Sequence, residues 1–313
     1  MAGRRGKAPG VASAEAHLAR GVHRAGRRGD HGLTEGSDDG RLSPPAPSTT
    51  VLVDTHCHLA DPAFEADRDA VLARASAAGL GHIVAIGETP ERAEVAVALA
   101  RATPGISATA GLHPHDARHW SEDRARWLER AATWTEVVAI GETGLDYHYD
   151  FSPRDVQRVA FEAQMDLAAR SGRPAIIHAR EADDDVLSVL RNHPRTTAIL
   201  HSFSSGPELC RGAVALGHYV SWSGMITFRN WSHDELIREV PRDRLLVETD
   251  GPYLAPVPMR GKRNEPAFVT HTAERLAHVV GWTVEECTAR IAENAARVFG
   301  PRVQDSRLVT RDS

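Results

Sequence analysis

The sequence predicts an α/β protein, a TIM-type (β/α)8 barrel preceded by a disordered N-terminal extension. Short β-rich runs alternate with amphipathic helical windows from Val51 onward, and eight such runs follow one another in about 250 residues. Residues 1–50 show no periodic apolar pattern. A doubly wound open sheet is the alternative, but its first strand leads into a glycine-rich phosphate loop, whereas the first run here ends in His-Cys-His.

Residues 1–50 are rich in Gly, Arg, Ser, Pro and Asp, a composition that predicts disorder because it cannot bury a core. Eight Arg or Lys against five Asp or Glu give this extension a charge of +3, so the rest of the chain carries −8 within the formal net charge of −5. The basic extension is either a nucleic-acid tether or a segment without a role. We expect the folded unit to start near Thr50, with the barrel over residues 51–300 and a disordered tail over residues 301–313.

Each predicted strand is a short run of β-branched and apolar residues, and turn or helical sequence follows it. This order is the one expected of parallel βαβ units. The eight runs are VLVDTHC from Val51, HIVAIG from His82, ISATAGL from Ile106, VVAIGE from Val137, PAIIHA from Pro174, TTAILHS from Thr196, HYVSWSG from His218 and LLVETD from Leu245.

Amphipathic windows between and after these runs predict the helices of the barrel. Their Leu, Val and Ala stripes are expected to pack in the core. The clearest windows run from Asp67 to Ala78, Pro90 to Arg101, Arg154 to Ser171, Asp183 to Asn192, Phe268 to Val280 and Val284 to Val298.

Composition excludes several classes of protein. Apolar residues at 42% and charged residues at 25% are typical of globular domains rather than disordered or fibrous chains. No run approaches the roughly 18 apolar residues of a membrane span, and the N-terminus lacks a secretory signal, so we expect a cytoplasmic protein. Three widely spaced cysteines indicate neither a disulfide framework nor a thiolate zinc site. The net charge of −5 argues against coating of duplex DNA but leaves open a nucleic acid held in a small pocket.

Imidazole and carboxylate groups stand at the carboxyl ends of five predicted strands, on the face where barrels place their chemistry. The first strand ends in His56 and His58, whose i, i+2 spacing puts both rings on one side of the strand, so that they can share an ion. The fourth, fifth, sixth and eighth strands end in Glu142, His178, His201 and Asp250.

These six groups predict a metal site, because buried ionisable groups cost several kcal/mol unless they are paired or bind a cation. Six ligands exceed the three or four of a mononuclear zinc site, so two divalent ions bridged by a carboxylate fit better, with Glu142 as the bridge. The ions and the two carboxylates leave a charge of about +2, which favours an anionic substrate. Mg, Mn or Zn could serve, and the four imidazoles favour Zn, Mn or Fe over Mg.

Longer motifs surround these residues. They are VDTHCHL from Val53, GLHPH from Gly111, IGETGLDY from Ile140, HAREA from His178, HSFS from His201 and ETDGPYLAP through RGKRNEP from Glu248 to Pro266. Together the motifs resemble those of the TatD family. The resemblance spans nearly all of residues 51–300. It implies a metal-dependent hydrolase acting on ester bonds, above all a deoxyribonuclease or phosphodiesterase with 3'-5' exonuclease-like action, on an amidohydrolase-like barrel. It also implies that His56, His58, Glu142 and Asp250 hold one ion, and Glu142, His178 and His201 the other.

Three rim residues are predicted to contact substrate. His113 ends the third strand, Arg180 follows the fifth, and Arg260 begins a basic loop after the eighth. The alternatives are a structural histidine and a solvated surface loop. Of the catalytic carboxylates, Asp250 is expected to orient or deprotonate the attacking water, and Glu142 to bridge the ions.

Two rival functions remain at this stage. A carboxyl-ester, lactone or amide hydrolase, including a tRNA deacylase, would use the same ions. A barrel kept only as a binding scaffold would have no reason to retain all six ligands. The sequence leaves open the native metal, DNA against RNA, the polarity of cutting and the oligomeric state.

Overall fold

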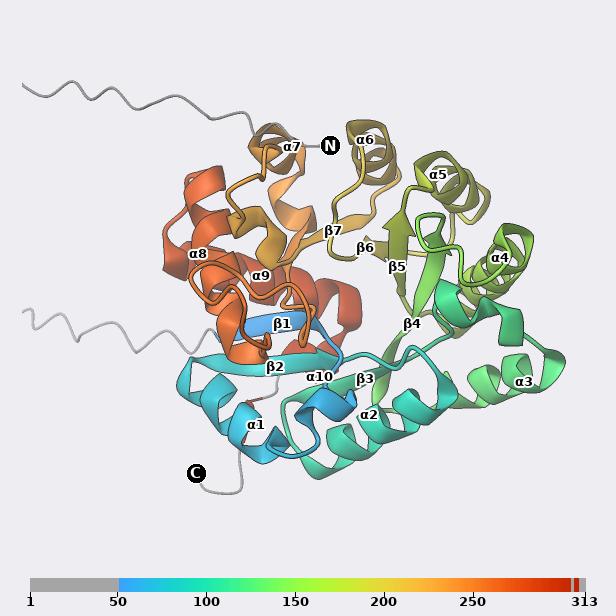
Figure 1. Ribbon diagram of the computed structural model, residues 1–313, viewed down its shortest axis with the longest axis horizontal. Coiled ribbons are helices and arrows are strands. Elements are labelled where there is room, and N and C mark those ends of the chain that lie inside the picture. Colours follow the sequence, from blue (N-terminus) through green and yellow to red (C-terminus); the bar gives the residue numbers. More distant parts are fainter. Residues whose placement is uncertain (1–50, 305–306, 310–313) are drawn as a thin grey trace, which may run out of the picture. The chain divides into compact units, whose positions relative to one another are not determined.

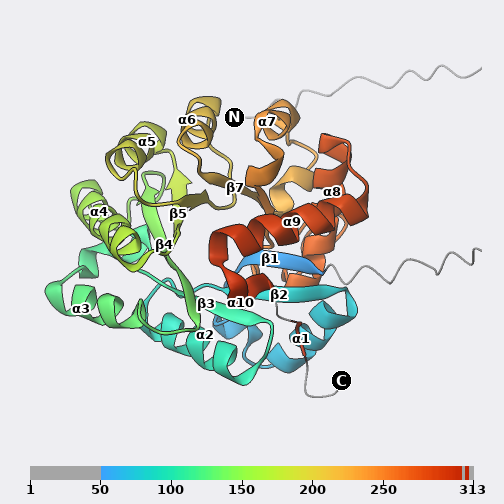
Figure 2. The ribbon, with the colours of Figure 1, turned by 180° about the vertical axis from the view of Figure 1, so that it is seen from behind.

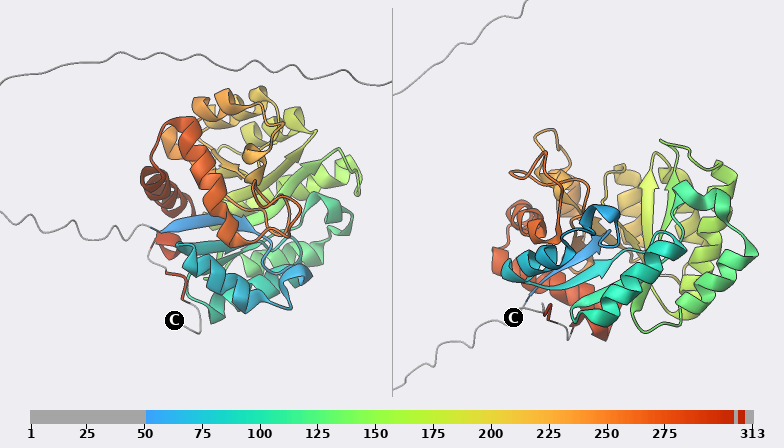
Figure 3. Two further views of the ribbon diagram at one scale, coloured as in Figure 1. Left: turned by 60° about the vertical axis from the view of Figure 1, so that its left-hand side comes forward. Right: turned by 60° about the horizontal axis from the view of Figure 1, so that its bottom comes forward.

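The computed structural model describes residues 51–304 and 307–309, and these residues form an eight-stranded parallel sheet rolled into a barrel (Figure 1). Neighbouring strands follow chain order, and the helices between them cover the outside, as Figure 3 shows from two further sides. The predicted barrel is confirmed, whereas residues 1–50 lie outside the described residues. The strands are β1 Leu52–Cys57, β2 Leu80–Ala85, β3 Ile106–Ala110, β4 Val137–Asp146, β5 Ala175–Arg180, β6 Ala198–Leu200, β7 Tyr219–Trp222 and β8 Leu245–Val247.

The barrel closes where the segment after β8 meets β1. A single bridge joins Cys57 to Gly251. The buried carboxylate of Asp54 accepts hydrogen bonds from the backbone N–H of Thr249 at 2.9 Å and from its hydroxyl at 2.6 Å. These contacts hold the residues that follow β8 against the end of β1, so that polar groups from both strands meet at the rim.

Several helices start at a residue whose side chain caps the first turn. Thr89 caps α2 ahead of a proline at the first turn, and Thr283 forms a capping box with Glu286 at the start of α9. No helix in the described part of the chain has the length and apolar character to span a bilayer. Helices α3, α6 and α7 were not among the clearest predicted windows. The helices are α1 Arg68–Ala77, α2 Pro90–Ala102, α3 Glu122–Ala131, α4 Arg154–Ser171, α5 Asp183–Asn192, α6 Pro207–Ala215, α7 Asp234–Glu239, α8 Val269–Val280, α9 Val284–Phe299 and α10 Pro301–Gln304.

Apolar residues of most strands form a cluster with helices α9 and α10. Val53 and Leu246 belong to it, together with Phe299 of α9 and Val303 of α10, and all four are buried. Figure 2 views the barrel from the side on which α9 and α10 lie. The polar groups of the strand ends are thereby left to the opposite, carboxyl-terminal rim.

The described part of the tail departs from the prediction of disorder after residue 300. Residues 301–304 form α10, and both Val303 and Leu308 are buried. Val309 donates its N–H to the carbonyl oxygen of Pro104 at 3.4 Å. The prediction is therefore wrong for residues 301–304 and 307–309, because Val303 and Leu308 pack against the barrel.

Strand β4 also differs from its predicted bounds. It was expected to end at Glu142 but continues to Asp146, pairing with β5 in a register that sets Asp146 beside Arg180. All ten residues of β4 are buried. Glu142 therefore lies inside the strand, and Asp146 takes the position at its end.

Candidate metal centre

Four side-chain atoms face one another at the carboxyl end of β1. Nε2 of His56 and Nε2 of His58 lie 3.3 Å apart, as their spacing predicts. Oε2 of Glu142 lies 3.4 and 3.5 Å from these nitrogens, and Oδ1 of Asp250 lies 3.7 and 3.3 Å from them. A tetrahedral zinc site with bonds of about 2.0–2.1 Å separates its ligand atoms by about 3.4 Å. These four residues, the first ligand set, thus have the spacing of a cation site.

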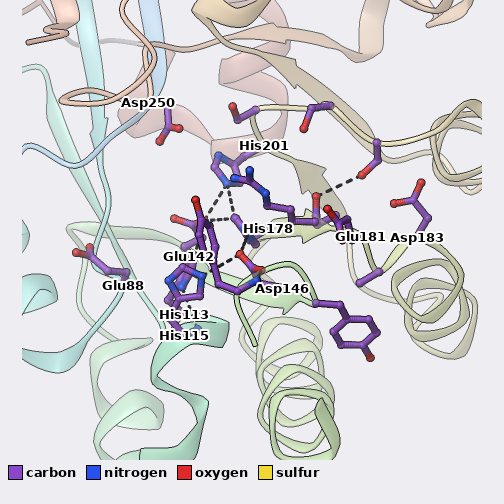
Figure 4. A pocket seen from close by; sticks show the side chains of 18 of the residues that line it. Glu88, His113, His115, Glu142, Asp146, His178, Glu181, Asp183, His201 and Asp250 are labelled. Atoms are coloured by element: carbon purple, nitrogen blue, oxygen red, sulfur yellow. Dashed lines mark hydrogen bonds and ion pairs between the residues drawn. The ribbon is translucent and has the colours of Figure 1, made fainter. Parts of the chain in front are cut away.

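A second group of atoms surrounds the other carboxylate oxygen of Glu142. Its Oε1 lies 3.1 Å from Nδ1 of His178 and 2.8 Å from Nε2 of His201, and the two nitrogens lie 3.4 Å apart. Figure 4 shows both imidazoles next to Glu142, with dashed lines joining the three residues. Glu142, His178 and His201 form the second ligand set. Glu142 therefore has one oxygen in each set.

The donor atoms fit a divalent cation. Among the described residues, Oε2 of Glu142 is a buried oxygen without a hydrogen-bond partner. Leaving such an acceptor unsatisfied costs about 1–3 kcal/mol or more. This is the oxygen that faces the two imidazoles of the first set, where a cation would bind it. Imidazole nitrogens and carboxylate oxygens are ordinary ligands of Zn and Mn.

In three imidazoles of these sets, the ring nitrogen that points away from Glu142 forms a hydrogen bond with a carboxylate. Such a carboxylate fixes the proton on that nitrogen and leaves the lone pair of the other nitrogen free for a cation. The pairs are His58 Nδ1 with Glu88 Oε2 at 3.4 Å, His178 Nε2 with Asp146 Oδ2 at 3.0 Å and His201 Nδ1 with Glu248 Oε1 at 3.2 Å.

Sequence analysis did not single out these three carboxylates. Asp146 and Glu248 lie inside the motifs IGETGLDY and ETD, and Glu88 follows β2 by three residues. An acid near a strand end was the signal that could have found them. The missing information was which imidazole each acid faces, since that depends on how neighbouring strands align.

Asp146→Asn is expected to weaken metal binding by about 10- to 100-fold, because the amide no longer supports the charge and orientation of His178. Calorimetric titration with Zn²⁺ or Mn²⁺ measures the change. Asp150→Asn is the matched control: this exposed carboxylate pairs with Arg154 on the surface, so metal affinity should not change. Wild-type affinity in Asp146→Asn would show that Asp146 does not support the site.

Burial and neighbouring charges shift the pKa values of the side chains in the ligand sets in opposite directions. Burial alone would raise the pKa of Glu142, but the positive charge of His201 and neighbouring imidazoles holds it well below its usual range. Burial also opposes the lowering of the pKa of Asp250, which the hydrogen bond from His58 produces. At His201, burial would lower the pKa, yet the charge of Glu142 raises it well above its ordinary value. Both carboxylates are thus ionised at neutral pH, and a bound cation would replace protons on the imidazoles.

His113, predicted as a substrate contact, lies beside the second ligand set. Its Nε2 is 3.3 Å from Oε1 of Glu142, while its Nδ1 accepts the backbone N–H of His115 at 3.1 Å. Burial lowers the pKa of His113 to about 4, so the ring is neutral. A neutral imidazole that accepts at Nδ1 carries its proton on Nε2. His113 therefore directs an N–H into the site, which suits an anionic substrate oxygen better than a cation.

The two predicted arginines occupy different positions. Arg180, the last residue of β5, lines a pocket that opens over both ligand sets. The guanidinium of Arg260 lies 3.9 Å from the ring centre of Phe228, and Arg260 is not part of the pocket lining within the described residues. Arg263 of the same loop forms two hydrogen bonds with the carboxylate of Asp67, at 2.7 and 2.8 Å. The structure brings Arg180 to the site and leaves Arg260 outside it.

A pocket of about 1510 Å³ opens over both ligand sets. Arg180 is its one Arg or Lys in the described part of the chain. Figure 4 shows Glu181 and Asp183 on the side of the pocket beyond His178. Carboxylates outside the ligand sets make the wall acidic, and they belong to Glu88, Asp116, Asp146, Glu181, Asp183, Asp184 and Asp185.

A barrel with imidazole and carboxylate groups gathered at its carboxyl rim is the architecture of a metal-dependent hydrolase. The family model described as TatD related DNase matches residues 53–300. The chain belongs to the TatD family, which confirms the predicted resemblance.

Relatives and solved structures agree with this assignment. YabD of Bacillus subtilis, named an uncharacterized metal-dependent hydrolase, is 38% identical over 252 residues, which cover 80% of this chain and 99% of YabD. The protein of Enterobacter lignolyticus named 3'-5' ssDNA/RNA exonuclease TatD is 35% identical over 257 residues, covering 80% and 99%. The crystal structure of YJJV, a TatD homologue from Escherichia coli, matches with a TM-score of 0.76 and 30% identity over 80% of this chain and 98% of YJJV.

Proposed function

We propose that the protein is a two-metal phosphodiesterase that cuts DNA or RNA at strand ends, with 3'-5' exonuclease-like action. The observation that carries the proposal is the position of Glu142. One of its oxygens lies 3.4 Å from His56 Nε2, and the other lies 2.8 Å from His201 Nε2. A carboxylate shared by two cation sites is typical of the paired metals of nucleases and phosphatases. Zn or Mn suits the imidazole-rich sets better than Mg.

Two bound divalent ions would lower the pKa of a water molecule and polarise a phosphoryl oxygen. The residues of the chain supply the remaining functions. Asp250, ionised and lining the pocket, would orient the attacking water and accept its proton. His113 would donate its Nε2–H to a phosphoryl oxygen, and Arg180 would bind a neighbouring phosphate.

The acidic wall of the pocket limits how much of a nucleic acid can bind. The charge of about +2 expected from the sequence did not include Glu88, Asp146 and Glu248, which lower the total charge of the site. Affinity for an anion therefore depends on the open side of the ligand sets, on His113 and on Arg180. One or a few phosphates can bind there, which favours a strand end and a weaker salt dependence than that of a duplex-coating protein. Relatives named ssDNA/RNA exonucleases support the same substrate class.

The rival is hydrolysis of a carboxyl ester, lactone or amide, including deacylation of tRNA. We expect kcat/KM for short single-stranded oligonucleotides to exceed that for carboxyl esters and lactones by about 100-fold or more, because a phosphodiester transition state places more negative charge next to His113 and Arg180. Both substrate classes should be assayed with the same metal at the same ionic strength. A clear preference for carboxyl substrates would overturn the nuclease assignment and leave the barrel and its ligand sets unaffected.

A further inference from the structure

Three exposed aromatic side chains line the pocket, and two of them lie on the segment between β4 and α4 while the third is Tyr253. Tyr149 is 47% exposed and Phe151 is 56% exposed, and both line the pocket. Their rings stack with centroids 5.3 Å apart and an interplanar angle of 22°. We call Tyr149 and Phe151 the aromatic pair. Large apolar surfaces left open inside a pocket indicate a ligand that packs on them.

The segment that carries the aromatic pair is held firmly. Oδ1 of Asp146 accepts the backbone N–H of Tyr149 at 2.9 Å. The imidazole of His115 packs edge-on against both rings, with centroids 5.5 Å from Tyr149 and 4.8 Å from Phe151. The hydroxyl of Ser152 donates to the carbonyl oxygen of His115 at 2.8 Å. The rings are therefore in place before any ligand binds.

The aromatic pair lies close to the second ligand set. The ring of His115 is 6.1 Å from that of His178, so one imidazole separates the aromatic pair from a member of the set. Asp146 hydrogen bonds to both of these imidazoles, at 2.8 and 3.0 Å. A nucleotide whose phosphate occupies the ligand sets would hold its base, or that of its neighbour, within reach of the two rings.

The surrounding charge identifies the part of a nucleotide that fits. Glu181 lines the same pocket and pairs with His148, whose ring packs against Tyr149, so its carboxylate disfavours a phosphate on that side of the aromatic pair. A nucleobase is flat and uncharged, and every base has a face that stacks on an aromatic ring. The guanidinium of Arg180 lies 5.0 Å from the centre of the Tyr149 ring, so the phosphate that Arg180 would bind lies next to a base stacked on the aromatic pair.

We propose that the aromatic pair is a stacking site for the base of a nucleotide next to the scissile phosphate. The proposal rests on the proposed nuclease function and specifies the substrate of that site. A base can stack there only after it has left its complementary strand, so the aromatic pair selects single-stranded ends over paired ends. Because stacking needs no base-specific hydrogen bond, the site accepts different bases.

The test combines a change in the protein with a change in the substrate. Wild type and the double variant Tyr149→Ala, Phe151→Ala are assayed on a single-stranded oligonucleotide and on the same oligonucleotide with abasic residues at its last two positions. We expect the double variant to lose about 10- to 100-fold in kcat/KM on the intact strand. Abasic residues should lower the wild-type value by a similar factor and cause no further loss in the double variant.

Controls separate stacking from effects on folding. The exchange Tyr149→Phe with Phe151→Tyr keeps both rings and should recover the kcat/KM that the double alanine variant loses on the intact strand. Val159→Ala, at an exposed position of α4, is the control without an expected effect. Independent, multiplying losses from the variant and the abasic residues would overturn the stacking site while leaving the nuclease function in place. Failure of wild type to cut the intact oligonucleotide would overturn both proposals.

Discussion

Glu142→Gln is expected to prevent the protein from holding two metal ions and to lower kcat/KM on oligonucleotides by about 10³-fold or more. The amide keeps the size of the side chain but loses its charge, and both ligand sets lose their shared member. Loss of the charge stabilisation that a metal gives a transition state amounts to several kcal/mol, at about 1.4 kcal/mol for each tenfold in rate. Elemental analysis of the purified variant, with steady-state kinetics at saturating metal, measures both effects.

A matched control distinguishes loss of the bridging carboxylate from a general loss of negative charge in the pocket. Glu181 lines the same pocket with a 64% exposed side chain and pairs with His148, so Glu181→Gln should leave the metal content unchanged. Circular dichroism establishes that each variant is folded. An unchanged metal content in Glu142→Gln would show that no ion is bridged there, and full wild-type activity after chelation would exclude metal catalysis.

The barrel and the meeting of six polar groups at its rim could be predicted from the sequence for a physical reason. Short apolar runs identify each strand, and polar groups at the carboxyl ends of parallel strands must meet at one rim. His56 and His58 illustrate this, because a period of two along the strand is enough to place both rings on one side. Neither inference requires information about which strands are neighbours in the sheet.

The features that could not be predicted from the sequence depend on how segments that are distant in the chain align with one another. Asp146 meets His178 because β4 runs past Glu142 and pairs with β5 so that Gly144 stands beside His178. The basic loop after β8 was expected to face substrate, but Arg263 pairs with Asp67 near the start of α1. Periodicity along one segment contains no information about such partners, which lie far away in the chain.

Asp250→Asn is expected to lower kcat by about 10²- to 10⁴-fold while changing substrate affinity little. The pKa of Asp250 is lowered, so its carboxylate is ionised and can accept a proton, which an amide cannot do. Asp250 has a φ of 58°, a left-handed conformation that Asn adopts more readily than most residues. Its N–H donates to the carbonyl oxygen of His56 at 2.9 Å, a backbone contact that the substitution keeps. The change therefore acts on the side chain alone.

Single-turnover rates and oligonucleotide binding, both at saturating metal, distinguish the roles that Asp250 can have. Asp184, an exposed carboxylate on the wall of the same pocket, provides the control Asp184→Asn, which should retain the wild-type rate. A slow Asp250→Asn variant that binds two ions and substrate normally identifies Asp250 as the group that activates the attacking water. A variant that loses one ion would instead assign Asp250 to holding the cation of the first ligand set. A wild-type rate would contradict both roles, since the imidazoles and Glu142 would then suffice for the reaction.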